Sequence, residues 1–202
     1  MLLILIPGRY NSYCFNAALF ISSLTFILSL IMWLIFDSGH NSFQFLCTID
    51  WLPAFNFYYT VGVDGISLFF LILTTFLIMV CVLISWGSIN YRLKEYLINF
   101  LLLEFLLIQV FSVLDLLLFY VFFESILMPM FLIIGIWGSR ERKIRAAYQF
   151  FLYTLVGSVL MLLGILIIYS HGGTTDLQML WNLEFSEKKQ IFLFVFFFLR
   201  FA

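Results

Sequence analysis

The chain has 202 residues, of which 64% are hydrophobic and 10% are charged, and its mean hydropathy is +1.12. Soluble domains contain about 45–50% apolar and about 25% charged residues, so this composition excludes a water-soluble protein and indicates one that lies in lipid. The formal net charge of -1 is too small to attract nucleic acid or an acidic substrate, and no nucleic-acid partner is expected.

Apolar stretches long enough to cross a bilayer occur along most of the chain. A transmembrane helix needs ~20 mostly apolar residues to cross ~30 Å of hydrocarbon. This rule predicts an all-α integral membrane protein, in which residues 1–202 form one domain built as a bundle of about five to six transmembrane helices. The spans are predicted at residues 17–36, 66–86, 96–113, 116–137 and 146–169, with a partial sixth at 191–202.

The third and fourth spans are separated by a short break. Together they are too long for one crossing, and Ser112–Asp115 is the only place for a tight reversal. Asp115 is then also predicted to start the fourth helix, because an Asp side chain accepts hydrogen bonds from the free N–H groups of a first helical turn. Gly172–Asp176, after the fifth span, is typical of a turn.

The basic residues predict how the chain is threaded. Short connections rich in Lys and Arg stay on the side of the membrane where the protein is made. Alternate crossing leaves Lys188 and Lys189 on one face, and the other face, predicted to be cytoplasmic or matrix, collects most of the rest. The residues of this basic face are Arg9, Arg92, Lys94, Arg140, Arg142, Lys143 and Arg145. The loop 140–145 is interpreted as topology-setting and in contact with lipid phosphates; the alternative is a proton-entry or subunit-contact surface.

The sequence lacks the motifs that mark several kinds of chemistry. Cys14, Cys47 and Cys81 form no C-x-x-C pair, and His40 and His171 lie in separate loops, so no metal site is predicted. The sequence also lacks a G-x-G-x-x-G motif, a Walker lysine loop and a cysteine cluster for iron–sulfur ligation. We therefore expect this chain itself to bind no NADH and to carry no electrons.

Glu124 is the residue most informative about function. It stands nine positions after Asp115 and thirteen before Trp137, about 13 Å and about 20 Å along a helix that rises about 1.5 Å per residue. Near the bilayer midplane an ionised side chain costs at least ~2.5–3.5 kcal/mol, so it must face the bundle, be paired or be protonated. One interpretation is a proton-relay carboxyl whose proton affinity depends on a movable partner. The other is a neutral glutamate that is hydrogen-bonded to a neighbouring helix as a packing contact.

Two further residues bear on the same question. Pro129 has no N–H to donate to the carbonyl of Ser125, so a kink with local water is predicted beside Glu124, although membrane helices also tolerate proline for reasons unconnected with transport. Glu104 lies in the middle of the third span and is the second carboxyl candidate, with a structural and a functional interpretation both open.

Long motifs resemble the family of NADH-ubiquinone oxidoreductase chain 4 in its plant and protist mitochondrial form. The resemblance extends from about Ile31 to the C-terminus. The motifs are GVDGISLFF at 62–70, DLLLFYVFFE at 115–124 followed by MPM at 128–130, GIWG at 135–138 before the basic loop, and YQFFLYTLVGS at 148–158.

The resemblance implies the N-terminal half of an antiporter-like subunit of respiratory complex I, in the mitochondrial inner membrane. Members of this family move protons while NADH, FMN, iron–sulfur clusters and ubiquinone are handled by other subunits, so no cofactor is expected in this chain. Glu124 matches the family's membrane-embedded glutamate, which pairs with a lysine on a later, broken helix. That lysine is absent from this sequence.

The family's chain is more than twice as long as this one, and it differs from this one at Arg200. Each of these differences leads to an expectation. A second polypeptide carrying the C-terminal half is expected to pack against 192–202 and to supply the lysine, beside other membrane-arm subunits and lipid. Arg200, where the family usually has an uncharged residue, is expected to reach toward the interface and pair with the terminal carboxylate. Two alternative functions remain: a structural membrane-arm subunit without pumping, and a component of a multisubunit cation/proton antiporter.

Overall fold

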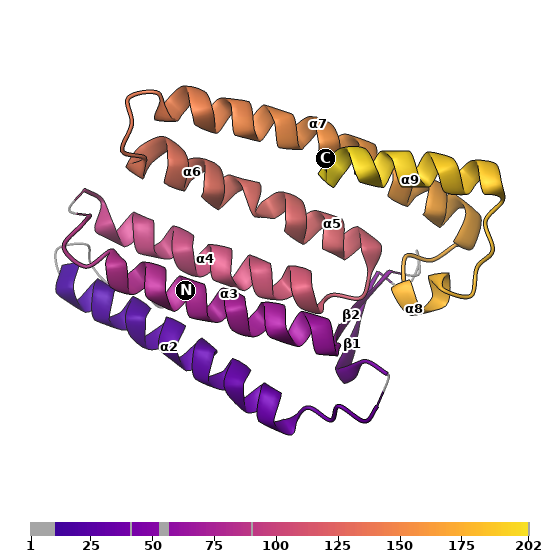
Figure 1. Ribbon diagram of the computed structural model, residues 1–202, viewed down its shortest axis with the longest axis horizontal. Coiled ribbons are helices and arrows are strands. Elements are labelled where there is room, and N and C mark those ends of the chain that lie inside the picture. Colours follow the sequence, from indigo (N-terminus) through magenta and orange to yellow (C-terminus); the bar gives the residue numbers. More distant parts are fainter. Residues whose placement is uncertain (1–10, 41, 53–56, 90, 202) are drawn as a thin grey trace.

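The computed structural model describes residues 11–40, 42–52, 57–89 and 91–201. Within these ranges the chain is a bundle of long helices with a small hairpin at one end (Figure 1). Five helical segments are long and apolar enough to cross a membrane, which confirms the predicted helical membrane bundle. They are α2 (Asn11–Ile35), α3 (Gly65–Ile84), α4 (Leu93–Ser112), α5 (Leu116–Ser125) continued by α6 (Leu127–Trp137), and α7 (Lys143–Gly172).

Most helices extend beyond their predicted spans. Helix α2 begins at Asn11 rather than residue 17, and α7 is three residues longer at each end than 146–169. The span rule counts only the apolar part of a helix, whereas the hydrogen-bonded backbone continues through polar residues until a cap or a turn ends it. The last predicted span corresponds to α9 (Glu187–Phe201), and a four-residue helix, α8 (Leu177–Leu180), precedes it.

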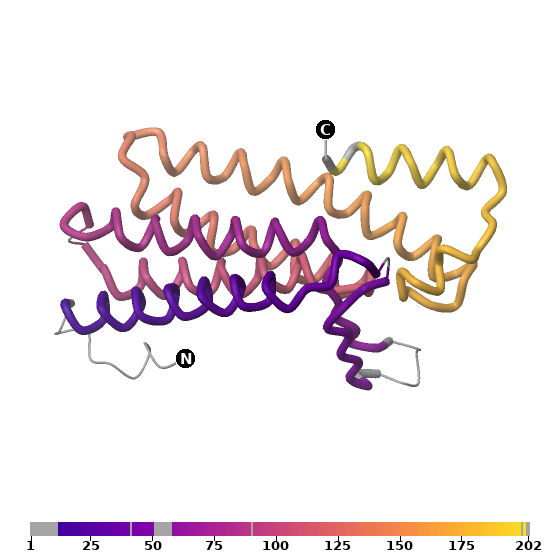
Figure 2. The backbone as a smooth tube through the Cα atoms, turned by 60° about the horizontal axis from the view of Figure 1, so that its bottom comes forward, coloured from indigo at the N-terminus to yellow at the C-terminus, as the bar shows by residue number. Residues whose placement is uncertain are grey.

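Helix α4 lies in the interior of the bundle, where it packs against α2, α3, α5 and α6. Helix α7 covers α6 and is itself covered by α9, so α2 and α9 lie at opposite edges of the molecule (Figures 1 and 2). The largest buried cluster joins α2, α3 and α4. Its members are Cys14, Phe15, Ala18, Ile78, Val82, Tyr96, Leu97 and Leu103.

A β-hairpin occupies the connection between α2 and α3. Strand β1 (Gln44–Leu52) pairs antiparallel with β2 (Phe57–Val63). The span rule does not anticipate this hairpin, because it registers only stretches long enough to cross lipid. The hairpin approaches the reversal between α4 and α5 closely: the N–H of Leu114 donates to the carbonyl of Thr60 at 2.9 Å. A Cβ at Gly62 would lie 2.8 Å from the terminal methyl groups of Leu46 and Leu114, so a larger residue there would require both leucine side chains to shift.

The predicted reversal at 112–115 is confirmed, as is the helix-start role of Asp115. Its Oδ1 accepts hydrogen bonds from the N–H groups of Leu117 at 2.8 Å and Leu118 at 3.0 Å. The side chain is 2% exposed, and its Oδ2 accepts a further bond from the Thr175 hydroxyl. The turn predicted after the fifth span is also present, since Gly173 ends α7 with a φ of 68°. Asp115 therefore joins the start of α5 to the segment between α7 and α8.

The basic connections lie at one end of the bundle. The α3–α4 connection, with Arg92, and the α6–α7 connection, with Arg140 and Arg142, are together at the end opposite the hairpin and α8 (Figure 1). This arrangement agrees with the alternate threading predicted from the charges. Arg9 lies outside the described residues.

Chemical labelling tests this threading. Cysteine at the exposed position Ser139, in the α6–α7 connection, should react with an impermeant thiol reagent only from the basic face, because lipid separates the two ends. The native Cys47 on β1 is exposed and should react only from the opposite face, in a background where Cys14 and Cys81 are replaced by alanine. Labelling of both cysteines from one side of sealed vesicles would contradict the topology.

The Asp115 contacts predict a loss of stability. Asp115→Ala should cost about 0.5–2 kcal/mol for the lost cap, together with the unpaired Thr175 hydroxyl, and should lower the midpoint of thermal unfolding in lipid nanodiscs. Asp176→Ala is the matched control: Asp176 also caps a helix, but it accepts from one backbone N–H and that helix has four residues. Equal effects of the two changes would contradict the role given to Asp115.

Candidate functional site

Glu124 lies on α5, one residue before that helix ends. Its side chain is 27% exposed, and α5 and α6 together form one 22-residue span in which Glu124 takes the ninth position. At about 1.5 Å per residue, the carboxyl stands in the middle third of this segment, far from both interfaces. An unpaired, ionised carboxylate at this depth would therefore cost free energy.

The span is interrupted next to Glu124. Helix α5 ends at Ser125 and α6 begins at Leu127. The cause is Pro129, which is fully buried in α6 and cannot donate to the carbonyl of Ser125. The Ser125 hydroxyl also bonds back to the carbonyl of Val121 at 2.7 Å, a contact that tends to bend helices. The helix is therefore interrupted here, but Ile126 keeps helical dihedrals, φ -61° and ψ -30°, so the predicted kink and the water expected there stay predictions.

The cation that faces Glu124 is Arg200, on the last turn of α9. Its Nη2 lies 3.8 Å from Glu124 Oε2, and its side chain is 4% exposed. Nη1 donates to the carbonyl of Thr154 on α7 at 2.8 Å, and the guanidinium lies 4.6 Å from the ring centroid of Phe123. Arg200 was expected to turn toward the interface, which is wrong: the packing of α9 on α7 holds it inside the bundle, against α5. The terminal carboxylate, with which it was expected to pair, lies outside the described residues.

The Glu124–Arg200 pair is electrostatic rather than hydrogen-bonded. A separation of 3.8 Å is too long for a direct N–H···O bond. Among the described residues, Glu124 Oε2 and the Nε and Nη2 atoms of Arg200 are buried without a hydrogen-bond partner. Buried groups in this condition are commonly bridged by water. The hydrogen-bonding capacity of both side chains is therefore only partly used by the described residues.

Glu104 occupies a separate place in the fold. It lies on α4, is 2% exposed, and its Oε1 accepts a hydrogen bond from the Thr25 hydroxyl of α2 at 2.5 Å. Glu104 faces α2, whereas Glu124 faces α9, so the structure does not bring the two candidate carboxyls together. Sequence spacing alone could not identify Thr25, because the two residues are 79 positions apart.

Other candidate residues form no further site. Within the described ranges, no group of three or more His, Cys, Asp or Glu is placed to hold a metal ion. His40 lies 3.7 Å from Asp37, and His171 lies 3.2 Å from Lys189, both at the surface. The absence of a metal site stays a prediction for the whole chain.

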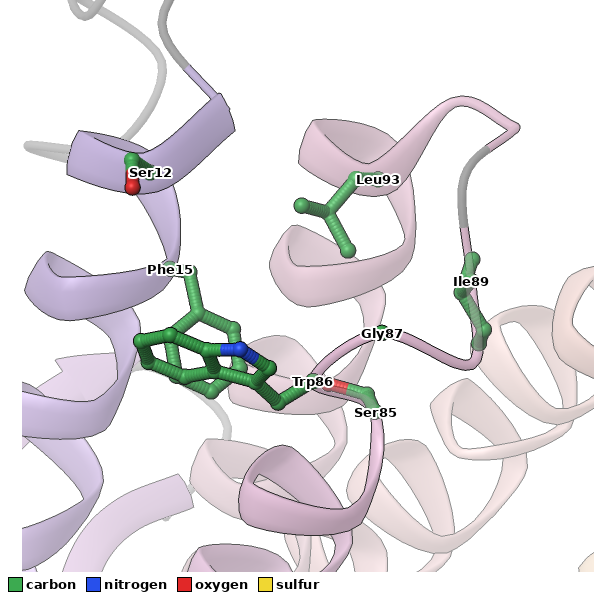
Figure 3. A pocket seen from close by; sticks show the side chains of 7 residues that line it. All are labelled: Ser12, Phe15, Ser85, Trp86, Gly87, Ile89 and Leu93. Atoms are coloured by element: carbon green, nitrogen blue, oxygen red, sulfur yellow. The ribbon is translucent and has the colours of Figure 1, made fainter.

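A cavity of about 170 Å³ lies between the basic ends of α2, α3 and α4. Figure 3 shows Trp86 lying across Phe15, with Leu93 pointing toward the same space. The two rings meet edge to face, with centroids 4.5 Å apart. None of the residues drawn in Figure 3 is ionisable, so this cavity contributes packing between helix ends rather than proton chemistry.

Comparison with known proteins gives consistent relatives. Residues 113–202 match the family model described as NADH:quinone oxidoreductase/Mrp antiporter, TM. Over 100% of its length the chain is 65% identical to NADH-ubiquinone oxidoreductase chain 4 of Chondrus crispus and 56% identical to that of Arabidopsis thaliana, and it covers 41% of each. The chain therefore spans about two fifths of the length of these curated relatives.

Two solved structures have the same fold. Respiratory complex I from Thermus thermophilus with bound NADH contains a chain that is 29% identical, with a TM-score of 0.85 over 100% of this chain and 40% of its own length. A chain of the Mrp complex from Dietzia sp. DQ12-45-1b matches with a TM-score of 0.81 over 95% of this chain and 21% of its own, at 14% identity, which shows the fold alone. The predicted antiporter-like architecture is confirmed.

A double-mutant cycle tests the Glu124–Arg200 pair. Glu124→Gln and Arg200→Met should each destabilise the protein, because each leaves the other member buried without its counter-charge. The double variant should lose less than the sum of the two, with a coupling energy of about 0.5–3 kcal/mol. The exposed pair Arg92–Glu95, at 3.5 Å, is the control and should couple by about 0–1 kcal/mol. Additive effects at Glu124 and Arg200 would show that the two side chains do not interact.

Proposed function

We propose that this chain belongs to the family of NADH-ubiquinone oxidoreductase chain 4, to whose members it is 65% and 56% identical over its whole length. Within that family it is the N-terminal part of a proton-translocating membrane-arm subunit of NADH:ubiquinone oxidoreductase. In this role it contributes to the enzyme without a redox site of its own. NADH oxidation and quinone reduction take place elsewhere in the complex, and this chain binds none of their cofactors. Its location is the mitochondrial inner membrane, with the basic connections on the matrix side.

One observation carries the proposal: Glu124 stands beside a proline-induced helix break, with a single buried cation 3.8 Å away and no hydrogen bond between them. With the cation close, the ionised carboxylate is favoured. When the cation recedes, the low dielectric favours the neutral acid, and a hydronium ion that reaches the break loses one O–H bond as the Glu124 carboxyl forms its own, which leaves neutral water. Return of the cation releases that proton. A change in the distance between the two side chains is thereby converted into uptake and release of one proton.

The remaining three fifths of the family's length supplies the rest of the machinery in this proposal. It contains the lysine that the family resemblance implies as the partner of Glu124. In this chain Arg200 is the cation that faces Glu124. The further partners are the neighbouring membrane-arm subunits and lipid, which covers the large apolar side chains on the outer faces of the helices.

The family model over residues 113–202, described as NADH:quinone oxidoreductase/Mrp antiporter, TM, favours a second candidate, a subunit of a cation/proton antiporter that works without electron transfer. The two candidates differ in their partners. Co-purification of the chain with iron–sulfur subunits supports the first, and its recovery in an assembly that lacks them supports the second. The third candidate is a structural subunit that does not pump protons. A measurement of proton pumping distinguishes it from the first candidate.

Substitution of Glu124 tests the proposal directly. Glu124→Gln in the assembled complex should preserve insertion and assembly but reduce quinone-coupled proton pumping in proteoliposomes, because the amide keeps the shape and loses the titratable proton. Glu104→Gln is the matched control and should have the smaller effect on pumping, since Glu104 has no facing cation among the described residues.

Two results would count against this function. Wild-type pumping and turnover in Glu124→Gln would remove the proposed role of Glu124 and leave the structural reading ahead. A larger loss in Glu104→Gln than in Glu124→Gln would show that the principal proton carrier is the other carboxyl.

A further inference from the structure

A second cavity lies at the opposite end of the bundle from the one in Figure 3. It has a volume of about 300 Å³ and is lined by residues of α2, α3, α4 and the hairpin. Much of its wall is apolar, but polar side chains from four different elements line it. These are Thr25 and Ser29 of α2, Thr75 of α3, Gln109 and Ser112 of α4, and Tyr59 of β2.

The hairpin forms the outer boundary of this cavity. The Tyr59 hydroxyl donates a hydrogen bond to Oε1 of Gln109. Burial, together with the nearby Cys47 thiol, raises the pKa of Tyr59, so the hydroxyl stays a donor at neutral pH. Gln109 and Ser112 lie near the end of α4 that meets the hairpin, so this part of the cavity is at the hairpin face of the protein.

Hydroxyl groups continue from there into the bundle. The Ser29 and Thr75 oxygens are 3.0 Å apart, and both side chains are buried, at 6% and 2% exposure. Thr25 is one helical turn further in along α2 and donates to Glu104. Glu104 itself is eight residues before Ser112, about 12 Å along α4. A line of polar groups therefore connects the hairpin face with a carboxyl near the middle of the membrane.

Glu104 is not held ionised by a counter-charge. The elements packed most extensively against α4 are α2, α3, α5, α6 and β2. Within their described residues they contain no Lys, Arg or His, and their titratable side chains are Tyr13, Cys14, Cys81, Tyr120, Glu124, Tyr58 and Tyr59. The nearest basic residues on α4 itself are at its first turn, ten positions from Glu104 or more. A carboxyl buried in these surroundings is more stable as the neutral acid.

The Thr25 hydroxyl can serve both protonation states of Glu104. Its oxygen lies 2.5 Å from Glu104 Oε1 and 2.8 Å from the carbonyl oxygen of Ser22. When Glu104 is ionised, the hydroxyl donates to the carboxylate. When Glu104 is protonated, its O–H donates to the Thr25 oxygen, and the hydroxyl turns to the Ser22 carbonyl. Both arrangements satisfy every polar hydrogen without moving a heavy atom.

We propose that Glu104 is a second proton-binding site, which exchanges protons with the hairpin face through water in the cavity between α2, α3, α4 and the hairpin. Each water molecule occupies about 30 Å³ in the liquid, so the volume accommodates several, and the lining hydroxyls and amide provide partners for them. The site is separate from Glu124, which faces α9 and Arg200. The exchanged species is the proton, and no other ligand is required.

Cysteine accessibility in the assembled complex tests the water path. Ser29→Cys places a thiol in the cavity wall, and Leu28→Cys, its neighbour, places one at the same depth on the outer face, where Leu28 is 51% exposed. With Cys47 replaced by serine, a small charged thiol reagent added at the hairpin face should label Ser29→Cys and leave Leu28→Cys unlabelled, since lipid contains no water to ionise the thiol. Labelling of neither thiol, or of both equally, would overturn the proposed path.

Infrared spectroscopy of the same complex tests the carboxyl itself. The wild type should show a protonated-carboxyl C=O band that shifts in D2O, that is lost in Glu104→Gln, and that remains in Glu124→Gln. Thr25→Val should move this band to higher frequency, because the carboxyl loses its hydrogen-bond partner. An identical spectrum in Glu104→Gln, or a band that D2O does not shift, would overturn the proposal. Neither measurement depends on pumping, so failure here is distinguishable from failure of the role given to Glu124.

Discussion

Hydrocarbon offers no hydrogen-bond partner, and this constraint shapes every polar feature of the molecule. The hydroxyls inside the helices bond to carbonyls of the preceding turn, as Thr75 does with Leu71 at 3.0 Å. The reversal between α4 and α5 is possible at the membrane edge because Asp115, Thr60 and Thr175 satisfy its backbone and side-chain groups. At Glu124 and Arg200 this requirement is only partly met, because buried polar atoms of both side chains have no hydrogen-bond partner among the described residues, and the proposed function places proton binding there.

The two membrane carboxyls have different surroundings, and the two proposals differ accordingly. Glu124 is partly exposed, stands at a helix break and faces a guanidinium, so in the proposed mechanism its charge depends on a partner carried by another helix. Glu104 is almost fully buried, lies within an unbroken helix and faces a hydroxyl, so in the proposal its protonation depends on access to water. The first proposal requires movement between helices, and the second requires contact with the aqueous phase at one face.

Much of the helical framework follows from the sequence, because lipid imposes a length rule and strong penalties on charge. The five spans, the reversal at 112–115, the cap at Asp115 and the break caused by Pro129 are all local features that neighbouring residues determine. The hairpin was not predicted, because its strands are too short to cross lipid and because contacts with the α4–α5 reversal stabilise it. Arg200 and Thr25 could not be matched to their carboxyls, since those pairs join residues 76 and 79 positions apart.

The contacts around Asp115 have a mechanical consequence. The start of α5 is held to β2 on one side, through Leu114 and Thr60, and to the segment before α8 on the other, through Asp115 and Thr175. Both partners are far away in the sequence, so the register of α5 is fixed by the fold and not by the helix alone. Glu124, nine positions after Asp115, is thereby set at a defined depth in the bundle.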